Sequence, residues 1–190
     1  MTICDSGCVI PLPPPYSNGC GVVIKPGGIN RIGFIKCDYD FTDITDQAEW
    51  DAAIAAGDAV WSGLLVAQKP KGSFSKKRIN SCSPEQVVGG EKSITFQDYG
   101  AGTVHDADGC AEYTFWNTIL ANPDAYRLVF ITCDGYLYGP VDSFVIEPDE
   151  IIEDSNQGTR YIDGTIMWND IDMLCPELTD LVFDQDSSVI

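Results

Sequence analysis

The stretch Arg127–Tyr138, RLVFITCDGYLY, decides the fold class of this chain. Its first seven residues are strongly apolar and rich in the branched and aromatic side chains that favour strands. Asp134-Gly135 follows and is the best hairpin-turn signal in the sequence, since glycine accepts the positive φ that tight hairpins require. Tyr136–Tyr138 is then the returning strand. The sequence therefore predicts an antiparallel hairpin here.

Further strands are predicted on both sides of this hairpin. Branched, aromatic or alternating apolar residues indicate strands at 31–40, 59–67, 93–98, 142–152 (interrupted at Pro148), 159–168 and 178–183. Gly89-Gly90 and residues 155–158 are expected to form turns. Because mostly short turns join the strands, we expect largely antiparallel sheets.

Two helices are predicted between these strands. In the first, Asp46 is the expected N-cap, Glu49 completes a capping-box pattern, Trp50 and Ile54 face the core, and Gly57 ends the helix. The second is expected from Cys110 to Ala121 and stops at Asn122-Pro123. Its cap is Asp108 or Gly109, and its broad apolar face comprises Phe115, Trp116, Ile119 and Leu120.

These elements predict a mostly β (α+β) fold. We expect an antiparallel β-sandwich or partly rolled barrel with one or two flanking helices. Residues 25–190 form a single β-rich domain, and residues 1–24 form an extended Cys/Pro-rich N-terminal arm. The run PLPPP at 11–15 favours extended polyproline geometry, so this arm can lie across a neighbouring subunit.

Composition fits a globular protein. Of the 190 residues, 44% are hydrophobic, which is enough for a sizeable core. Neither a membrane span nor a secretory signal is recognisable in the sequence, so we expect synthesis in a host cytoplasm and no membrane partner.

The charge is unevenly distributed. The formal net charge is −18, which argues against specific nucleic-acid binding. Residues 1–92 hold 9 basic and 10 acidic groups, a net of −1, whereas residues 93–190 hold 2 basic and 19 acidic groups, a net of −17. Residues 69–78 (KPKGSFSKKR) are expected to form a hairpin tip or an extended loop. This candidate assembly loop gathers Lys69, Lys71, Phe74, Lys76, Lys77 and Arg78. The asymmetry serves solubility, or it makes the chain self-complementary, so that head-to-tail copies form rings or filaments.

Metal sites have weak sequence support. Cys4, Cys8 and Cys20 resemble part of a zinc site, but a fourth ligand is missing locally. Residues 105–109 (HDADG) resemble a fragment of a calcium loop without its remaining ligands. We predict no metal and no cofactor. Thiols are expected to be reduced, with Cys37, Cys110 and Cys133 buried as small hydrophobic side chains.

Catalytic motifs are missing from the sequence. His105 is the single histidine, and neither a G-x-S-x-G elbow, a P-loop nor a G-x-G-x-x-G motif occurs. The many carboxylates supply chance pairs like those of glycosidases. We predict that the chain is not an enzyme.

Three stretches resemble virion structural proteins of tailed phages that infect Bacteroidetes, including crAss-like phages. They are residues 43–50 (DITDQAEW), 69–82 and 161–168 (YIDGTIMW), and the resemblance spans roughly residues 25–170. It implies a particle component, located in the virion, that contacts copies of itself and other virion proteins.

The resemblance leaves three roles open. In a tail-tube or neck protein, residues 69–78 would be the long loop that reaches the neighbouring ring, and an acidic lumen would let DNA pass without sticking. In a capsid auxiliary or decoration protein, the N-terminal arm would clamp the capsid. A host-glycan or receptor-binding module would need exposed aromatic platforms, but Trp50, Trp61, Trp116 and Trp168 are better explained as core.

Overall fold

The computed structural model describes residues 27–78, 80–82, 84–100, 111–154 and 159–183. Two α-helices, α1 (Gln47–Ala56) and α2 (Ala111–Ala121), and a short 3-10 helix, η2 (Pro123–Ala125), accompany the sheet. The strands are β1 (Ile29–Lys36), β2 (Ala59–Trp61), β3 (Val66–Gln68), β4 (Ser73–Lys77), β5 (Gln86–Asp98), β6 (Tyr126–Thr132), β7 (Tyr136–Val141), β8 (Val145–Ile152), β9 (Arg160–Asn169) and β10 (Glu177–Leu178).

All strands belong to one antiparallel sheet. Its order is β10-β7-β6-β1-β3-β5-β9-β8, with β2 also paired to β1 and β4 also paired to β5. Strands β7 and β8 are not paired with each other, so the sheet is not closed into a barrel. The predicted fold class, a mostly β antiparallel fold with flanking helices, is confirmed.

The sheet is forced to roll because a short link joins distant strands. Six interstrand spacings would separate β7 from β8 in a flat sheet, about 29 Å. Residues 142–144 connect them, and the four Cα steps from Val141 to Val145 reach at most about 15 Å. Phe144 of this link is buried against Phe34 on β1, with ring centroids 5.6 Å apart. The two halves of the sheet therefore face each other around a shared interior.

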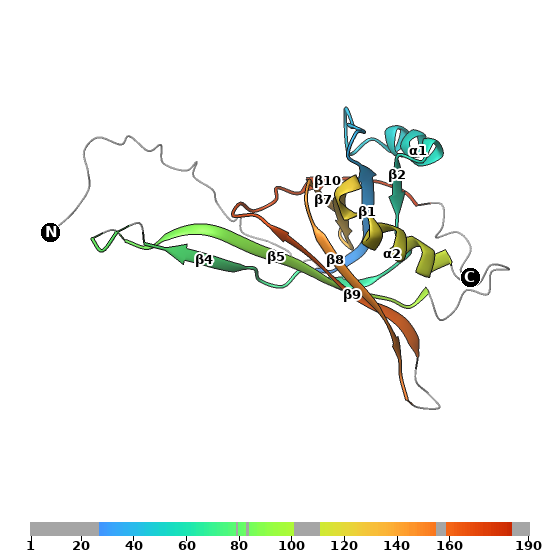
Figure 1. The fold of residues 1–190 in the computed structure, drawn as a ribbon. Coiled ribbons are helices and arrows are strands. Elements are labelled where there is room, and N and C mark those ends of the chain that lie inside the picture. The colour runs from blue at the N-terminus through green and yellow to red at the C-terminus, as the bar shows by residue number, and fades with distance from the viewer. Residues whose placement is uncertain (1–26, 79, 83, 101–110, 155–158, 184–190) are drawn as a thin grey trace, which may run out of the picture.

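The main core fills this interior. Residues from β1 and β6 meet residues from β5 and β9 across it, and Phe130 faces Trp168 with ring centroids 6.4 Å apart. Helix α2 covers one end of the interior (Figure 1). Its Trp116 stacks on Phe96 at 4.3 Å, and its indole N–H donates to the buried Asp98 at 2.9 Å. Helix α2 is thus the plug of a half-rolled barrel.

A second, smaller core lies on the opposite face of β1 and β6. Helix α1 packs there through Trp50 and Ala53. Asp46 caps the helix as predicted, because its side chain accepts from the Ala48 N–H at 3.0 Å, and Gly57 ends it in the left-handed region with φ 77°. Glu49 does not complete a capping box: its carboxylate accepts from the N–H groups of Thr42 and Asp43 instead.

Several strand predictions need correction. The predicted strand 59–67 is divided into β2 and β3, because Ser62 turns to bond β1, with its hydroxyl accepting from the Ile32 N–H at 3.0 Å. Gly89-Gly90 is no turn but part of β5. A side chain at position 90 would come within 2.4 Å of the Asp170 carbonyl, so the glycine permits a close backbone approach. The predicted final strand is only the two-residue β10.

Some burial predictions are also wrong. Ile54 and Leu120 were predicted to face the core, because each lies four residues after a tryptophan, but both are exposed. The buried face of each helix is therefore narrower than the four-residue spacing of its apolar residues suggested. Cys37 and Cys133 are exposed because they follow the ends of β1 and β6 rather than lying within them.

Trp50, Trp116 and Trp168 are buried as predicted, and Trp61 is partly buried. The predicted arm, Cys110 and the cap at Asp108 or Gly109 lie outside the described residues.

Truncating the plug tests this architecture. Trp116→Ala is expected to lower the free energy of unfolding by about 3–5 kcal/mol, because it opens a cavity and leaves Asp98 without its indole donor. Leu120→Ala, on the exposed side of the same helix, should cost less than about 1 kcal/mol. Urea unfolding measures both, and equal losses would contradict a plug seated on Trp116.

Candidate functional site: the basic hairpin

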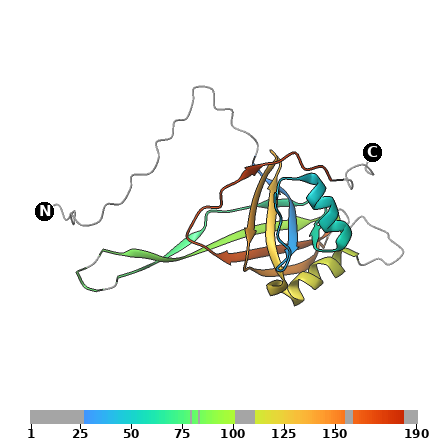
Figure 2. The ribbon, with the colours of Figure 1, turned by 90° about the horizontal axis from the view of Figure 1, so that it is seen from above.

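Strands β4 and β5 form a hairpin that protrudes from the rolled sheet. Figures 1 and 2 both show it extending away from the rest of the described chain. β5 pairs with β9 only from Glu91 onward, so residues 86–89 pair with β4 alone. A bulge between Ser75 and Lys76 shifts the register within the hairpin. The predicted loop is therefore largely a paired β-ribbon.

Both faces of this ribbon carry a basic side chain. Lys76 and Lys77 are adjacent on β4, so they point to opposite faces, and both are exposed. Arg78 follows them and lies 3.7 Å from the carboxylate of Glu85 across the hairpin. Both partners of that ion pair are largely exposed, so it contributes little to stability. We call Lys76, Lys77 and Arg78 the hairpin tip; their positive charge remains available to a partner.

Exposed apolar residues accompany the charges. Phe74 is 48% exposed on β4, and Val87 and Val88 are exposed on β5. An isolated two-stranded hairpin is marginal in water, because no third layer buries its apolar side chains. Apolar side chains on a basic, projecting element are typical of an interaction surface.

The remaining members of the predicted loop lie at the base of the hairpin. Lys71 is exposed beside Gly72, whose close approach to the Glu91 carbonyl leaves no room for a side chain. The ammonium of Lys69 lies 5.7 Å from the centre of the Trp168 ring. The structure thus places Lys76, Lys77, Arg78 and Phe74 on the protruding part and separates Lys69 from them.

An acidic face lies on the outer side of β8 and β9. Ile146, Ile162 and Ile166 point inward to the main core. Alternation then places Glu147, Asp149 and Asp163 on the outside, where all three are exposed. We call these three residues the acidic face.

Within this acidic face, two carboxylates stand opposite each other. Asp149 and Asp163 are direct cross-strand partners. Like charges in that position destabilise a sheet unless a cation lies nearby. The negative charge of the second half of the sequence is thus partly gathered on one surface, a grouping that sequence reasoning did not locate.

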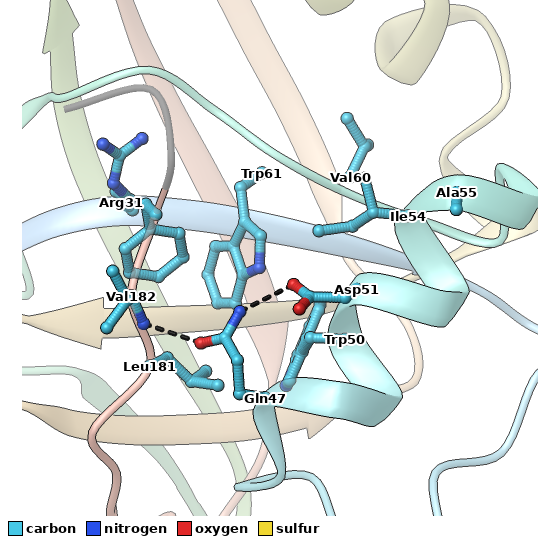
Figure 3. A pocket seen from close by; sticks show the side chains of 11 residues that line it. Arg31, Gln47, Trp50, Asp51, Ile54, Ala55, Val60, Trp61, Leu181 and Val182 are labelled. Carbon is cyan, nitrogen blue, oxygen red and sulfur yellow. Dashed lines mark hydrogen bonds between the residues drawn. The ribbon is translucent and has the colours of Figure 1, made fainter. Parts of the chain in front are cut away.

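A groove of about 500 Å³ lies between α1 and β2 (Figure 3). Residues 181–183 form one wall of it: the Val182 N–H donates to the Gln47 side chain at 2.7 Å, and Phe183 packs on Trp61 with centroids 5.3 Å apart. Gln47 in turn donates to Asp51 at 2.7 Å. Residues 181–183 are thus held against α1 and β2 as part of the groove's wall, and Val182 already uses the Gln47 side-chain oxygen.

The described residues contain no group of three or more His, Cys, Asp or Glu side chains that could hold a metal ion. Cys4, Cys8, Cys20 and the stretch 105–109 lie outside them. Four described cysteines, Cys37, Cys82, Cys133 and Cys175, are exposed free thiols. Among the described helices, none is long and apolar enough to cross a membrane.

No family model matches this chain, and neither the curated proteins nor the solved structures give a match. The hairpin and the acidic face are therefore the features from which a function is inferred.

Limited proteolysis tests whether the hairpin is accessible. Trypsin is expected to cleave after Lys76, Lys77 or Arg78 faster than after Lys36 or Lys92, because a projecting ribbon unfolds locally at low cost. Mass spectrometry of early fragments gives the order of cleavage. A K76Q/K77Q/R78Q variant should lose the early cut. Slower cleavage at the hairpin than at Lys92 would contradict an exposed ribbon.

Proposed function

We propose that this protein is a non-enzymatic structural subunit of a tailed-phage virion, a tail-tube or neck protein that assembles head-to-tail. The basic β4–β5 hairpin of one copy would dock on the acidic face of the next. The observation that carries the proposal is the projecting ribbon itself, whose exposed Phe74, Val87 and Val88 lack cover from the described chain.

Charge complementarity supports the choice of partner. The hairpin tip presents Lys76, Lys77 and Arg78, and the acidic face presents Glu147, Asp149 and Asp163. Opposite patches accelerate and orient association, and a cation between Asp149 and Asp163 would relieve their mutual repulsion. A second copy supplies both patches, so one kind of contact can build the whole assembly.

The two surfaces are separate parts of the fold, so head-to-tail docking would give a ring or an open assembly. If the hairpin of each copy docks on the acidic face of the next and not back on its own partner, the contact is heterologous, and repeated copies form rings or filaments. Apolar contacts by Phe74, Val87 and Val88 would contribute affinity, while the charges would set orientation.

The phage setting derives from the sequence resemblance over residues 43–50, 69–82 and 161–168. The resemblance implies a particle component, and in a tail-tube role residues 69–78 would be the loop that reaches the neighbouring ring. A hairpin that starts within this range and projects from the body suits that role.

Charge reversal at the hairpin tip tests the proposal. K76E/K77E/R78E is expected to abolish the rings, tubes or other large assemblies of the purified protein at low salt, because carboxylates then meet the acidic face. Negative-stain microscopy and sedimentation measure the loss. The charge-conserving K76R/K77R/R78K variant is the matched control and should assemble. A folded reversal variant that assembles normally would refute the charge contact.

A mixing experiment identifies the partner surface. D149K/D163K, which reverses the acidic face, should also fail to assemble alone. An equimolar mixture with K76E/K77E/R78E should form alternating assemblies, because each hairpin then meets a face of opposite charge. If the hairpin variant fails but the face variant assembles alone, the hairpin docks elsewhere. If the mixture stays dispersed, the pairing of these two surfaces is wrong.

A further inference from the structure

A groove of about 590 Å³ lies at the end of the rolled sheet away from α2. Register places this end opposite the plug: Ile29 pairs with Thr132 here, whereas Phe34 pairs with Leu128 near α2. The groove is lined by residues that include Lys69, Lys92, Phe130, Tyr138, Met173 and Leu174. We call it the mouth. Mouths of barrel-like sheets are common places for small-molecule sites.

Lys92 is a buried cation within the mouth. It lies directly opposite Trp168 in the sheet, so its side chain points to the interior face, and that side chain is only 7% exposed. Its acceptor among the described residues is Asp170, at 3.4 Å. Charge-assisted bonds to carboxylates are usually 2.7–2.9 Å long, so this contact compensates the desolvated ammonium incompletely.

Lys69 adds a second cation beside the first. Its ammonium lies 5.7 Å from the centre of the Trp168 ring. Burial lowers the pKa of Lys69, and the nearby charge of Lys92 lowers it further. Asp170 accepts from Lys92 through one carboxylate oxygen, and its other oxygen already accepts the Asp172 N–H at 2.9 Å. The lysine end of the mouth carries an excess of positive charge.

The opposite wall of the mouth is aromatic and apolar. Phe130 and Tyr138 stack with centroids 4.9 Å apart and planes within 5°. Leu174 packs against the main core beside them, and the highly exposed Met173 adds a flexible apolar side chain at the rim. The mouth therefore joins a cationic end to apolar walls.

We propose that the mouth binds an organic carboxylate carried on an apolar chain, with the carboxylate between Lys92 and Lys69 and the chain along Phe130, Tyr138 and Leu174. A carboxylate would supply the acceptors that Lys92 lacks at short distance, and the apolar chain would be removed from water by the aromatic wall. The site is separate from the hairpin tip and the acidic face; Lys69 belongs to the predicted assembly loop, but it lies at the base of the hairpin beside Trp168.

Calorimetric titration of the wild-type chain with decanoate tests the site. One saturable equivalent is expected. Lys92→Met keeps the apolar stem without the charge and should weaken binding by about tenfold or more, and Lys69→Gln should weaken it less, because its ammonium is the more exposed of the two. Lys71→Gln, an exposed lysine outside the groove, is the matched control and should bind as wild type does.

A second ligand separates the charge from the chain. Decanol has the same chain without the carboxylate and should bind about tenfold more weakly than decanoate. Near-ultraviolet circular dichroism checks that Lys92→Met is folded. Lys69→Gln changes an exposed position, so it tests the loss of a charge from the site even if Lys92→Met does not fold. Equal affinity for decanol, equal affinity of both lysine variants and wild type, or no saturable decanoate binding would each overturn the proposal.

Discussion

The link between β7 and β8 is the constraint on which the rest of the structure depends. Residues 142–144 join two strands that five others separate in the sheet order, so the sheet must roll until its edges approach. Rolling creates the interior that Phe34, Phe144 and Trp116 fill. It also gives the sheet two ends, of which α2 covers one while the other carries Lys69 and Lys92.

The hairpin leaves the body because β5 is longer than its pairing with β9. β5 is 13 residues long, but the rolled sheet pairs it with β9 only over residues 91–98. The remaining residues run past the core and pair with β4, where they carry exposed valines and face two lysines. The proposed docking element is thus an extension of a core strand, anchored in the interior by Ile94 and Phe96. Such an element can transmit a contact to the rigid part of the fold.

Local signals in the sequence predicted local structure well. Asp46 and Gly57 bound α1, and Asn122-Pro123 ends α2, because caps and proline act through neighbouring backbone groups. Non-local features were not predictable in this way. Gly89-Gly90 was predicted as a turn, because the sequence does not show that the backbone of Asp170 approaches Gly90 and excludes a side chain there. Likewise, Lys92 and Asp170 are brought together by the pairing of β5 with β9, and Asp149 meets Asp163 by the pairing of β8 with β9.

The central proposal is that copies of the chain associate through oppositely charged surfaces. Sedimentation velocity of the unmodified protein, over a range of concentrations at low and at high salt, tests this most directly. The account predicts large species at low salt that grow with concentration and dissociate as salt screens the contact between the hairpin and the acidic face. A single monomeric species at every concentration and in both salt conditions would contradict it.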